Sequence, residues 1–416
     1  MPNFPVTLLT AFVVASVCAW LIFAGMAHLT GGNVGIWPDR AASLPPNRLF
    51  DLTRSTVTAA GLLAGVFAIV YAYRKQKIEE AGSFRADADS LGVRYQSAAE
   101  LLGNESSAAR LAGVYSLSRL ADEDSTQRET ICRLLCGYLR MSYDPVSSPP
   151  GEREVRHAII GVISEHLQDP AAPTSWCGFR LDFSGATFDG GSFSDSHFIN
   201  TCVDFSGSRF VAGTTHFDGC TFEDVELDFG DGESDPAIFD GGRLHFIGAQ
   251  FKVGARVNFV FARFVSGSLV FGASEFLSGS SMNFSSAELD GVSIGFGGPV
   301  WLGANFRGGY VGFDGAKLKS GLLSFMGVRF LGAELSLNSL RQTGGMVLFD
   351  QASFEAGSVT LDEADLYRDG VSFEEASNPQ GTVSPWPIPL TGNRRGSTKR
   401  RIAGRRPRSE RRSPRG

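Results

Sequence analysis

The sequence predicts a mixed chain made of two membrane-spanning helices, a small helical domain, a β-solenoid and a disordered basic tail. Three observations carry this prediction. Two apolar runs without charge lie near the N-terminus, large apolar residues recur at steps of five and then seven or eight in the C-terminal half, and residues 381–416 hold 11 basic residues and one acidic residue. A chain of 416 residues exceeds one ordinary domain, so several parts are expected.

Residues 1–77 are predicted to form a membrane anchor with transmembrane helices at 6–29 and 55–73. Both runs are apolar and long enough to span a bilayer. The alternative for the first run is a cleaved signal peptide, but it has no Lys or Arg in front of it. Arg74, Lys75 and Lys77 follow the second run, which places the bulk of the chain in the cytoplasm under the plasma membrane.

Residues 78–170 are predicted to form a helical adaptor or cap. Leu111, Val114, Tyr115, Leu117 and Leu120 follow the spacing of an amphipathic helix. Asp124 and Gln127 resemble a capping pair that opens the next helix, at 131–139. A third apolar face follows at 155–163. Such a unit would cover the exposed edge at the end of a solenoid.

Residues 176–376 are predicted to form the solenoid, because neither a flat strand nor a straight helix keeps residues five apart on one side. The pairs five apart are Phe246 with Phe251, Phe259 with Phe264, Phe271 with Phe276, Phe313 with Leu318, Phe325 with Phe330, Phe349 with Phe354, and Leu361 with Leu366. Two pairs make a coil of roughly 24 residues, and about eight coils stack at ~4.8 Å each.

The repeat units resemble the pentapeptide-repeat family, in which a small residue lies two places before a Phe or Leu. The matching units are Phe183, Ala186 and Phe188; Phe313, Ala316 and Leu318; and Phe349, Ala352 and Phe354. The resemblance implies a right-handed quadrilateral β-helix. This chain departs from the family pattern because later units insert two or three residues. The two apolar runs before the helical segment are similar to a membrane-anchored subgroup from actinobacteria.

The tail at 381–416 is predicted to be disordered, since it keeps no apolar period. Its arginines leave three interpretations open. They bind anionic lipid headgroups, or they bind nucleic acid without any interleaved aromatic residue, which disfavours this interpretation, or they only offset the charge of an acidic body. The solenoid segment 176–380 holds 26 acidic and 12 basic residues.

No catalytic, cofactor or metal site is predicted. The acidic stretch Glu223, Asp224, Glu226, Asp228, Asp231, Glu233 and Asp235 resembles part of a calcium loop but lacks its full length, so a solvated loop is the favoured interpretation. The six histidines, His28, His157, His166, His197, His216 and His245, show no metal spacing in sequence. Gly295, Gly297 and Gly298 are interpreted as turn glycines, and the six cysteines as reduced thiols.

Two function classes follow, with an enzyme as a third and minor alternative. The first is a non-enzymatic membrane-tethered scaffold that presents the solenoid to an unknown cytoplasmic protein. The second is a regulator or protector of a topoisomerase-like enzyme that imitates the charge and width of duplex DNA, as the resemblance implies for some relatives. Continuous rows of carboxylates on the solenoid would favour the second class, and scattered carboxylates the first.

Overall fold

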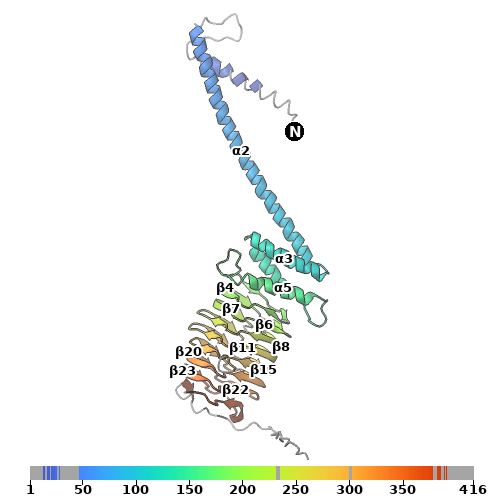
Figure 1. Cartoon of the computed structure of the whole chain (residues 1–416), viewed down its shortest axis with the longest axis vertical. Helices are drawn as coiled ribbons and strands as arrows, with labels where there is room; N and C mark the ends of the chain where they lie inside the picture. The colour runs from blue at the N-terminus through green and yellow to red at the C-terminus, as the bar shows by residue number, and fades with distance from the viewer. Residues whose placement is uncertain are drawn as a thin grey trace, which may run out of the picture. The chain divides into compact units, whose positions relative to one another are not determined.

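The computed structural model describes parts of residues 13–28, residues 46–230, 235–298 and 302–377, and a few residues between 382 and 390 (Figure 1). The chain divides into two compact units, Met1–Val93 and Arg94–Gly416. The predicted disordered tail, 381–416, lies almost entirely outside the described residues and stays a prediction.

The first unit contains most of helix α2 (Pro46–Leu102), which is 57 residues long. Within it, Thr53–Glu79 has a mean hydropathy of 1.8 and is, in the described part of the chain, the one helix long and apolar enough to cross a membrane. The predicted span at 55–73 lies inside this segment. The predicted span at 6–29 falls mostly outside the described residues, which show a short apolar helix at Ser16–Gly25. Two spans therefore stay a prediction.

Three helices of the second unit cover the first turn of the solenoid: α3 (Ser107–Glu123), α4 (Arg128–Leu139) and α5 (Glu152–Glu165). Their apolar faces are buried against one another, and α4 contacts β1 while α5 contacts β3. The predicted capping pair is wrong. Asp124 accepts hydrogen bonds from the Thr126 backbone N–H and hydroxyl, and Gln127 occupies the N-cap of α4 without a side-chain bond.

Residues 181–377 of the second unit form a β-solenoid of the right-handed type with about eight turns; the repeat predicted the number of turns, and the resemblance implied the handedness. Two parallel sheets face each other. Sheet A comprises β1 (Leu181–Asp182), β4 (His197–Asp204), β7 (Thr221–Asp228), β9 (Gln250–Phe251), β10 (Arg256–Asn258), β12 (Glu275–Phe276), β13 (Ser281–Asn283), β16 (Asn305–Phe306), β17 (Tyr310–Gly312), β20 (Arg329–Ser336), β23 (Ser353–Thr360) and β25 (Val383–Ser384).

Sheet B comprises β2 (Thr187–Phe188), β3 (Gly191–Ser192), β5 (Arg209–Phe210), β6 (Thr214–His216), β8 (Ile238–His245), β11 (Arg263–Val270), β14 (Glu288–Leu289), β15 (Val292–Gly295), β18 (Lys317–Leu318), β19 (Gly321–Ser324), β21 (Arg341–Gln342), β22 (Met346–Leu348) and β24 (Val371–Ser372). A short 3₁₀ helix, η3 (Arg368–Gly370), precedes β24.

Large side chains fill the interior in four columns, one residue from each turn in each column. The third column is an unbroken stack of rings whose centroids lie 4.6 to 5.1 Å apart: Phe193, Phe217, Phe246, Phe271, Phe296, Phe325, Phe349 and Phe373. All seven residue pairs that predicted the solenoid are buried. The first column begins with Phe183, Phe205 and Phe229, the second with Phe188, Phe210 and Phe239, and the fourth with Phe198, Phe222 and Phe251. The second column belongs to sheet B and the fourth to sheet A.

The alternation of five-residue and longer steps has a backbone cause. The five-residue steps are tight turns, in which the residue two places after a column residue has positive φ, as at Gly185 and Phe261. The longer steps cross a sheet with an extra bulge. Gly321 shows why this bulge needs glycine: its φ is +95°, and an added Cβ would lie 2.0 Å from the carbonyl oxygen of Val292.

One interior position breaks the apolar rule. Gln342 pairs with Leu318 and occupies the second column, where the other turns place Phe or Leu, and it is 1% exposed. Its amide donates to the carbonyl oxygens of Gly345 and Gly370 and accepts from the backbone N–H of Tyr367. The side chain therefore fixes η3 in the last turn, in place of apolar contact.

Candidate functional site

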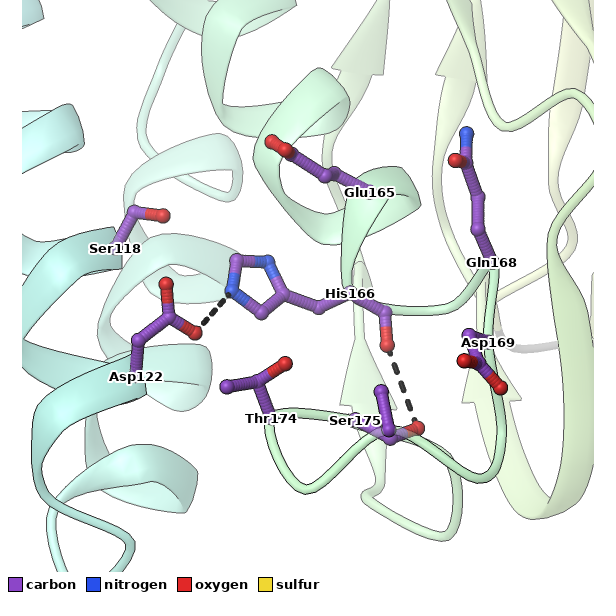
Figure 2. A pocket seen from close by; sticks show the side chains of 9 residues that line it. Ser118, Asp122, Glu165, His166, Gln168, Asp169, Thr174 and Ser175 are labelled. Carbon is purple, nitrogen blue, oxygen red and sulfur yellow. Dashed lines mark hydrogen bonds and ion pairs between the residues drawn. The ribbon is translucent and has the colours of Figure 1, made fainter.

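A polar pocket of about 260 Å³ lies between α3, the end of α5 and the following loop (Figure 2). His166 points into it from the end of α5, and its Nε2 lies 3.1 Å from Oδ1 of Asp122 on α3. The His166 ring stacks on the ring of the buried Trp176, and the two ring centroids lie 4.3 Å apart. Serine hydroxyls from Ser118 and Ser175 line the same pocket, so it is the place to look for nucleophilic chemistry.

The geometry around His166 does not fit a general base. Its Nδ1 lies 2.6 Å from the carbonyl oxygen of Val162, and its Nε2 faces the carboxylate of Asp122. Both ring nitrogens therefore face acceptors, and neither is directed at a hydroxyl that it would deprotonate. The Ser175 hydroxyl instead donates to the backbone carbonyl of His166. The Asp122–His166 pair thus joins α3 to α5 and has a structural role.

A second polar cluster joins the cap to the first solenoid turn. The carboxylate of Asp189, 5% exposed, accepts hydrogen bonds from Tyr143 and Arg153 and lies 3.0 Å from Nε2 of His157. Burial alone would raise the pKa of Asp189, but the hydrogen bonds from His157 and Tyr143 lower it to about 2. Burial, together with the carboxylate, raises the pKa of Tyr143. The cluster is fully partnered and links α5 to the solenoid.

A groove of about 430 Å³ runs along the solenoid at the turn between the first and second columns. Phe261, Ser286 and Gly315, which lie at tight turns, form one wall. Arg263, Glu288 and Lys317, each of which directly precedes a residue of the second column, form the other. The lining residues of the groove come from four successive turns: Pro236, Phe261, Arg263, Ser286, Glu288, Gly315 and Lys317. Phe261 is half-buried and has φ of +59°. Glu288 pairs with Lys317 at 3.3 Å and with Lys319 at 3.1 Å.

Basic side chains are arranged differently on the two sheets. On sheet A and its edges, Lys252, Arg307 and Arg329 pair with Glu223, Glu275 and Glu355, whereas Arg256 forms no ion pair with a described residue. On sheet B, Arg209, Arg243 and Arg263 form no ion pair within the described ranges. Arg209 and Arg263 lie in the row that precedes the second column, with Lys317 and Arg341 further along it. Within the described residues, Arg209 and Arg263 therefore carry positive charge in this row that no ion pair offsets, whereas Lys317 pairs with Glu288 of the same row.

Two histidines that are distant in sequence meet on sheet B. His216 and His245 are direct partners in the ladder between β6 and β8, and their ring centroids lie 5.3 Å apart. Nδ1 of His216 lies 2.7 Å from Oδ2 of Asp218. Burial lowers the pKa of His245 below its ordinary value, and the nearby Asp218 carboxylate only partly opposes this shift. Each histidine directly precedes a Phe of the third column, and this shared position was the sequence signal for their proximity.

The other sequence candidates have structural roles where they are described. The acidic residues Glu223, Asp224, Glu226 and Asp228 belong to strand β7 and so are not part of a loop. In this region the spacing of the large apolar residues is interrupted only at 230–236, of which 231–234 lie outside the described residues. Gly297 permits close packing, because an added Cβ would lie 1.8 Å from the Met326 carbonyl oxygen. All six cysteines are free thiols.

Comparison with known families agrees with the architecture. Residues 182–231 match the family model described as pentapeptide repeats, in nine copies. These turns are similar to pentapeptide repeats. The match covers the first turns of the solenoid, where the five-residue step is most regular, and the later pentapeptide-like turns continue the same four interior columns.

No curated protein matches the chain. Among solved structures, the chain is similar to QnrB1 in a trypsin-treated form, described as a plasmid-mediated fluoroquinolone resistance protein. The sequence identity is 16%, the TM-score is 0.19, and the match covers 51% of this chain and 86% of that chain.

Proposed function

We propose that this chain is a non-enzymatic protein-interaction module whose pentapeptide-repeat solenoid holds an acidic segment of a partner protein in the groove beside Phe261. One observation carries the proposal. A strained aromatic residue lies in a groove that is bordered by positive charge on an otherwise acidic solenoid.

The conformation of Phe261 is costly. An L-residue in the left-handed region costs about 1–2 kcal/mol, and a bulky side chain is a genuine outlier there. Other described turns place a small or polar residue at the same position, as Gly315, Ser286 and Glu363 show. Glycine would remove the strain, so folding does not account for the aromatic ring. Strain of this kind clusters at ligand-binding positions.

The groove has the size and charge for a short extended segment. Its walls span four turns, so three spacings of ~4.8 Å give a length of about 14 Å, which accommodates about four extended residues. Arg263 and Lys317 outnumber Glu288 in the lining, and Lys319 also pairs with Glu288, so carboxylates on the partner would be attracted. The basic tail of this chain has the wrong charge for this groove.

The proposal includes a membrane tether. Thr53–Glu79 is the candidate span, and Arg74, Lys75 and Lys77 at its C-terminal end favour a cytoplasmic position for the residues that follow. A module held in this way at the inner face of the plasma membrane would present the groove to a cytoplasmic protein. The contact of the basic tail with anionic lipid belongs to the same proposal.

A photo-crosslinking residue tests the groove directly. We would place it at Ser286, in the groove, and as a control at Ser281, on sheet A, in cells that express the full-length chain. A discrete protein adduct formed only from position 286 is the expected result. Equal adducts from both positions, or none from either, would contradict the proposal.

Two variants then separate binding from folding. Phe261→Gly should keep or raise the melting temperature and yet lose the adduct, because it removes both strain and contact area. Arg263→Glu should lose the adduct, whereas its control Arg307→Glu should retain it. The two variants are matched because Arg263→Glu places a new carboxylate near Glu288, and Arg307→Glu places one near Glu275. A Phe261→Gly protein that still forms the adduct would refute the role of the ring.

The tether has its own test. The full-length chain should stay in the membrane pellet after an alkaline carbonate wash, and a deletion of residues 1–79, which removes both predicted spans, should be released. Protease added to intact cells should leave the residues beyond 80 uncut. Digestion from outside would reverse the proposed topology, and release of the full-length chain by carbonate would remove the tether without affecting the groove.

One observation favours the duplex-mimicking alternative. Asp182, Asp204 and Asp228 pair in register on sheet A and form a column of three carboxylates over successive turns. The column then changes to Asn258 and Asn283. A DNA supercoiling assay with a bacterial topoisomerase distinguishes the two functions, since the interaction module should leave the enzyme unaffected, whereas a mimic should displace DNA from it.

A further inference from the structure

We propose that His216, Asp218 and His245 form a binding site for a divalent transition-metal ion such as zinc on the outer surface of sheet B. This site lies apart from the groove beside Phe261 and does not depend on the proposed function. It joins two turns of the solenoid through side chains that are 29 positions apart in sequence (245 − 216).

The three ligand atoms already converge. One ligand atom from each residue lies within 4.8 Å of the other two. His216 and His245 face each other through the parallel register of β6 and β8, with ring planes at 85°. Asp218 follows Phe217 at the tight turn, which directs its carboxylate back toward His216, where Oδ2 lies 2.7 Å from Nδ1.

The donor set suits this class of ion. Two imidazoles and one carboxylate are borderline ligands that zinc, nickel, cobalt and copper accept, whereas calcium and magnesium prefer an all-oxygen shell. Three protein ligands leave a further coordination position for water or for a group from a partner. Within the described residues, neither ring nitrogen of His245 makes a hydrogen bond, so this side chain can turn toward an ion without losing one.

The carboxylate is held by the next turn. Oδ1 of Asp218 accepts a hydrogen bond from the backbone N–H of Ile247 at 2.8 Å, which leaves Oδ2 directed at the histidines. Such supporting hydrogen bonds orient the ligands of metal sites. The ladder neighbours limit the site to two turns, because Ser192 precedes His216 and Val270 follows His245. An ion bound here would clamp the second turn to the third.

Zinc binding by the full-length protein tests the site. The protein would be purified in detergent through a tag that contains no histidine, and titrated with zinc chloride by calorimetry. We expect one ion per chain with a Kd of about 1 µM or lower, and a higher melting temperature with zinc than with chelator. His245→Asn should weaken binding by at least about tenfold, and Asp218→Asn should weaken it as well.

His197→Asn is the matched control. His197 also precedes an interior Phe, but it lies outside the cluster, so this variant should bind zinc like the parent. Cobalt substitution gives a second measurement, since its visible absorption should change in the His245→Asn protein and not in the control. The inference is overturned by an absence of saturable binding, by equal affinity in the parent and His245→Asn, or by an equal loss in the control. Chelator-treated variants should melt like the parent, which separates loss of a ligand from loss of the fold.

Discussion

The buried Gln342 allows the stability gained from apolar stacking to be compared with that gained from hydrogen bonding inside the solenoid. Gln342→Leu would restore the apolar second column between Leu318 and Leu366. Burying the leucine side chain gains roughly 2 kcal/mol. The substitution leaves the Gly370 carbonyl and the Tyr367 N–H without their partner, at about 2 kcal/mol each, whereas the half-buried Gly345 carbonyl can bind water instead. We therefore expect a net loss of about 2 kcal/mol, concentrated in the last turn.

Hydrogen–deuterium exchange is the appropriate assay, because the turns of a solenoid need not unfold together. Peptides covering 366–373 should exchange faster in Gln342→Leu, while those from the first turns should be unchanged. Leu318→Met, a volume-conserving change in the same column, is the control and should cost less than about 1.5 kcal/mol. If Gln342→Leu were as stable as the parent and the Tyr367 amide remained protected, apolar stacking would outweigh the hydrogen bonds and the reasoning would be wrong.

Three further predictions concern buried groups. Because the pKa of Asp189 is lowered to about 2, its carboxylate contributes about 2 kcal/mol to the free energy of unfolding above pH 4, and this contribution is lost as the pH falls toward 2. The melting temperature of Asp189→Asn should therefore lack this acid dependence. Phe246→Ala removes a ring stacked on both sides and should cost about 3–5 kcal/mol by thermal denaturation; a change below 1 kcal/mol would indicate collapse of the column. Ser208→Ala should stabilise the protein by about 1 kcal/mol, since this buried hydroxyl has no partner among the described residues.

The interior of the solenoid could be predicted from sequence because regularly spaced large apolar side chains must be buried inside the coils. Rings spaced by five and then seven residues fit neither a flat strand nor a helix, and the turns that place Phe246 beside Phe251 also place them in separate columns. The bulges could be expected from inserted glycines. Gln342 could not, because its fit depends on backbone groups at Tyr367 and Gly370, which the sequence does not reveal.

The two candidate sites depend on register, which is why sequence reasoning did not find them. His216 and His245 are 29 residues apart, whereas an uninterrupted coil takes about 24, and the difference arises from the insertion after Phe229. Aligning the chain by the Phe that follows each histidine would have superposed them. The groove needs a further fact, the positive φ of Phe261 at a position where the other described turns place small or polar residues.

The distribution of charge along the solenoid bears on the choice between the two functions. Residues 182–240 hold 13 acidic residues and one basic residue, residues 243–341 hold five acidic and nine basic residues, and residues 350–375 hold eight acidic residues and one basic residue. A duplex mimic needs negative charge over a continuous length, because DNA carries one charge per ~1.7 Å of its axis. Here the middle turns are basic, and they contain the groove beside Phe261. An acidic protein segment would bind where a duplex-binding enzyme would be repelled, so the same middle turns favour the interaction module over the mimic.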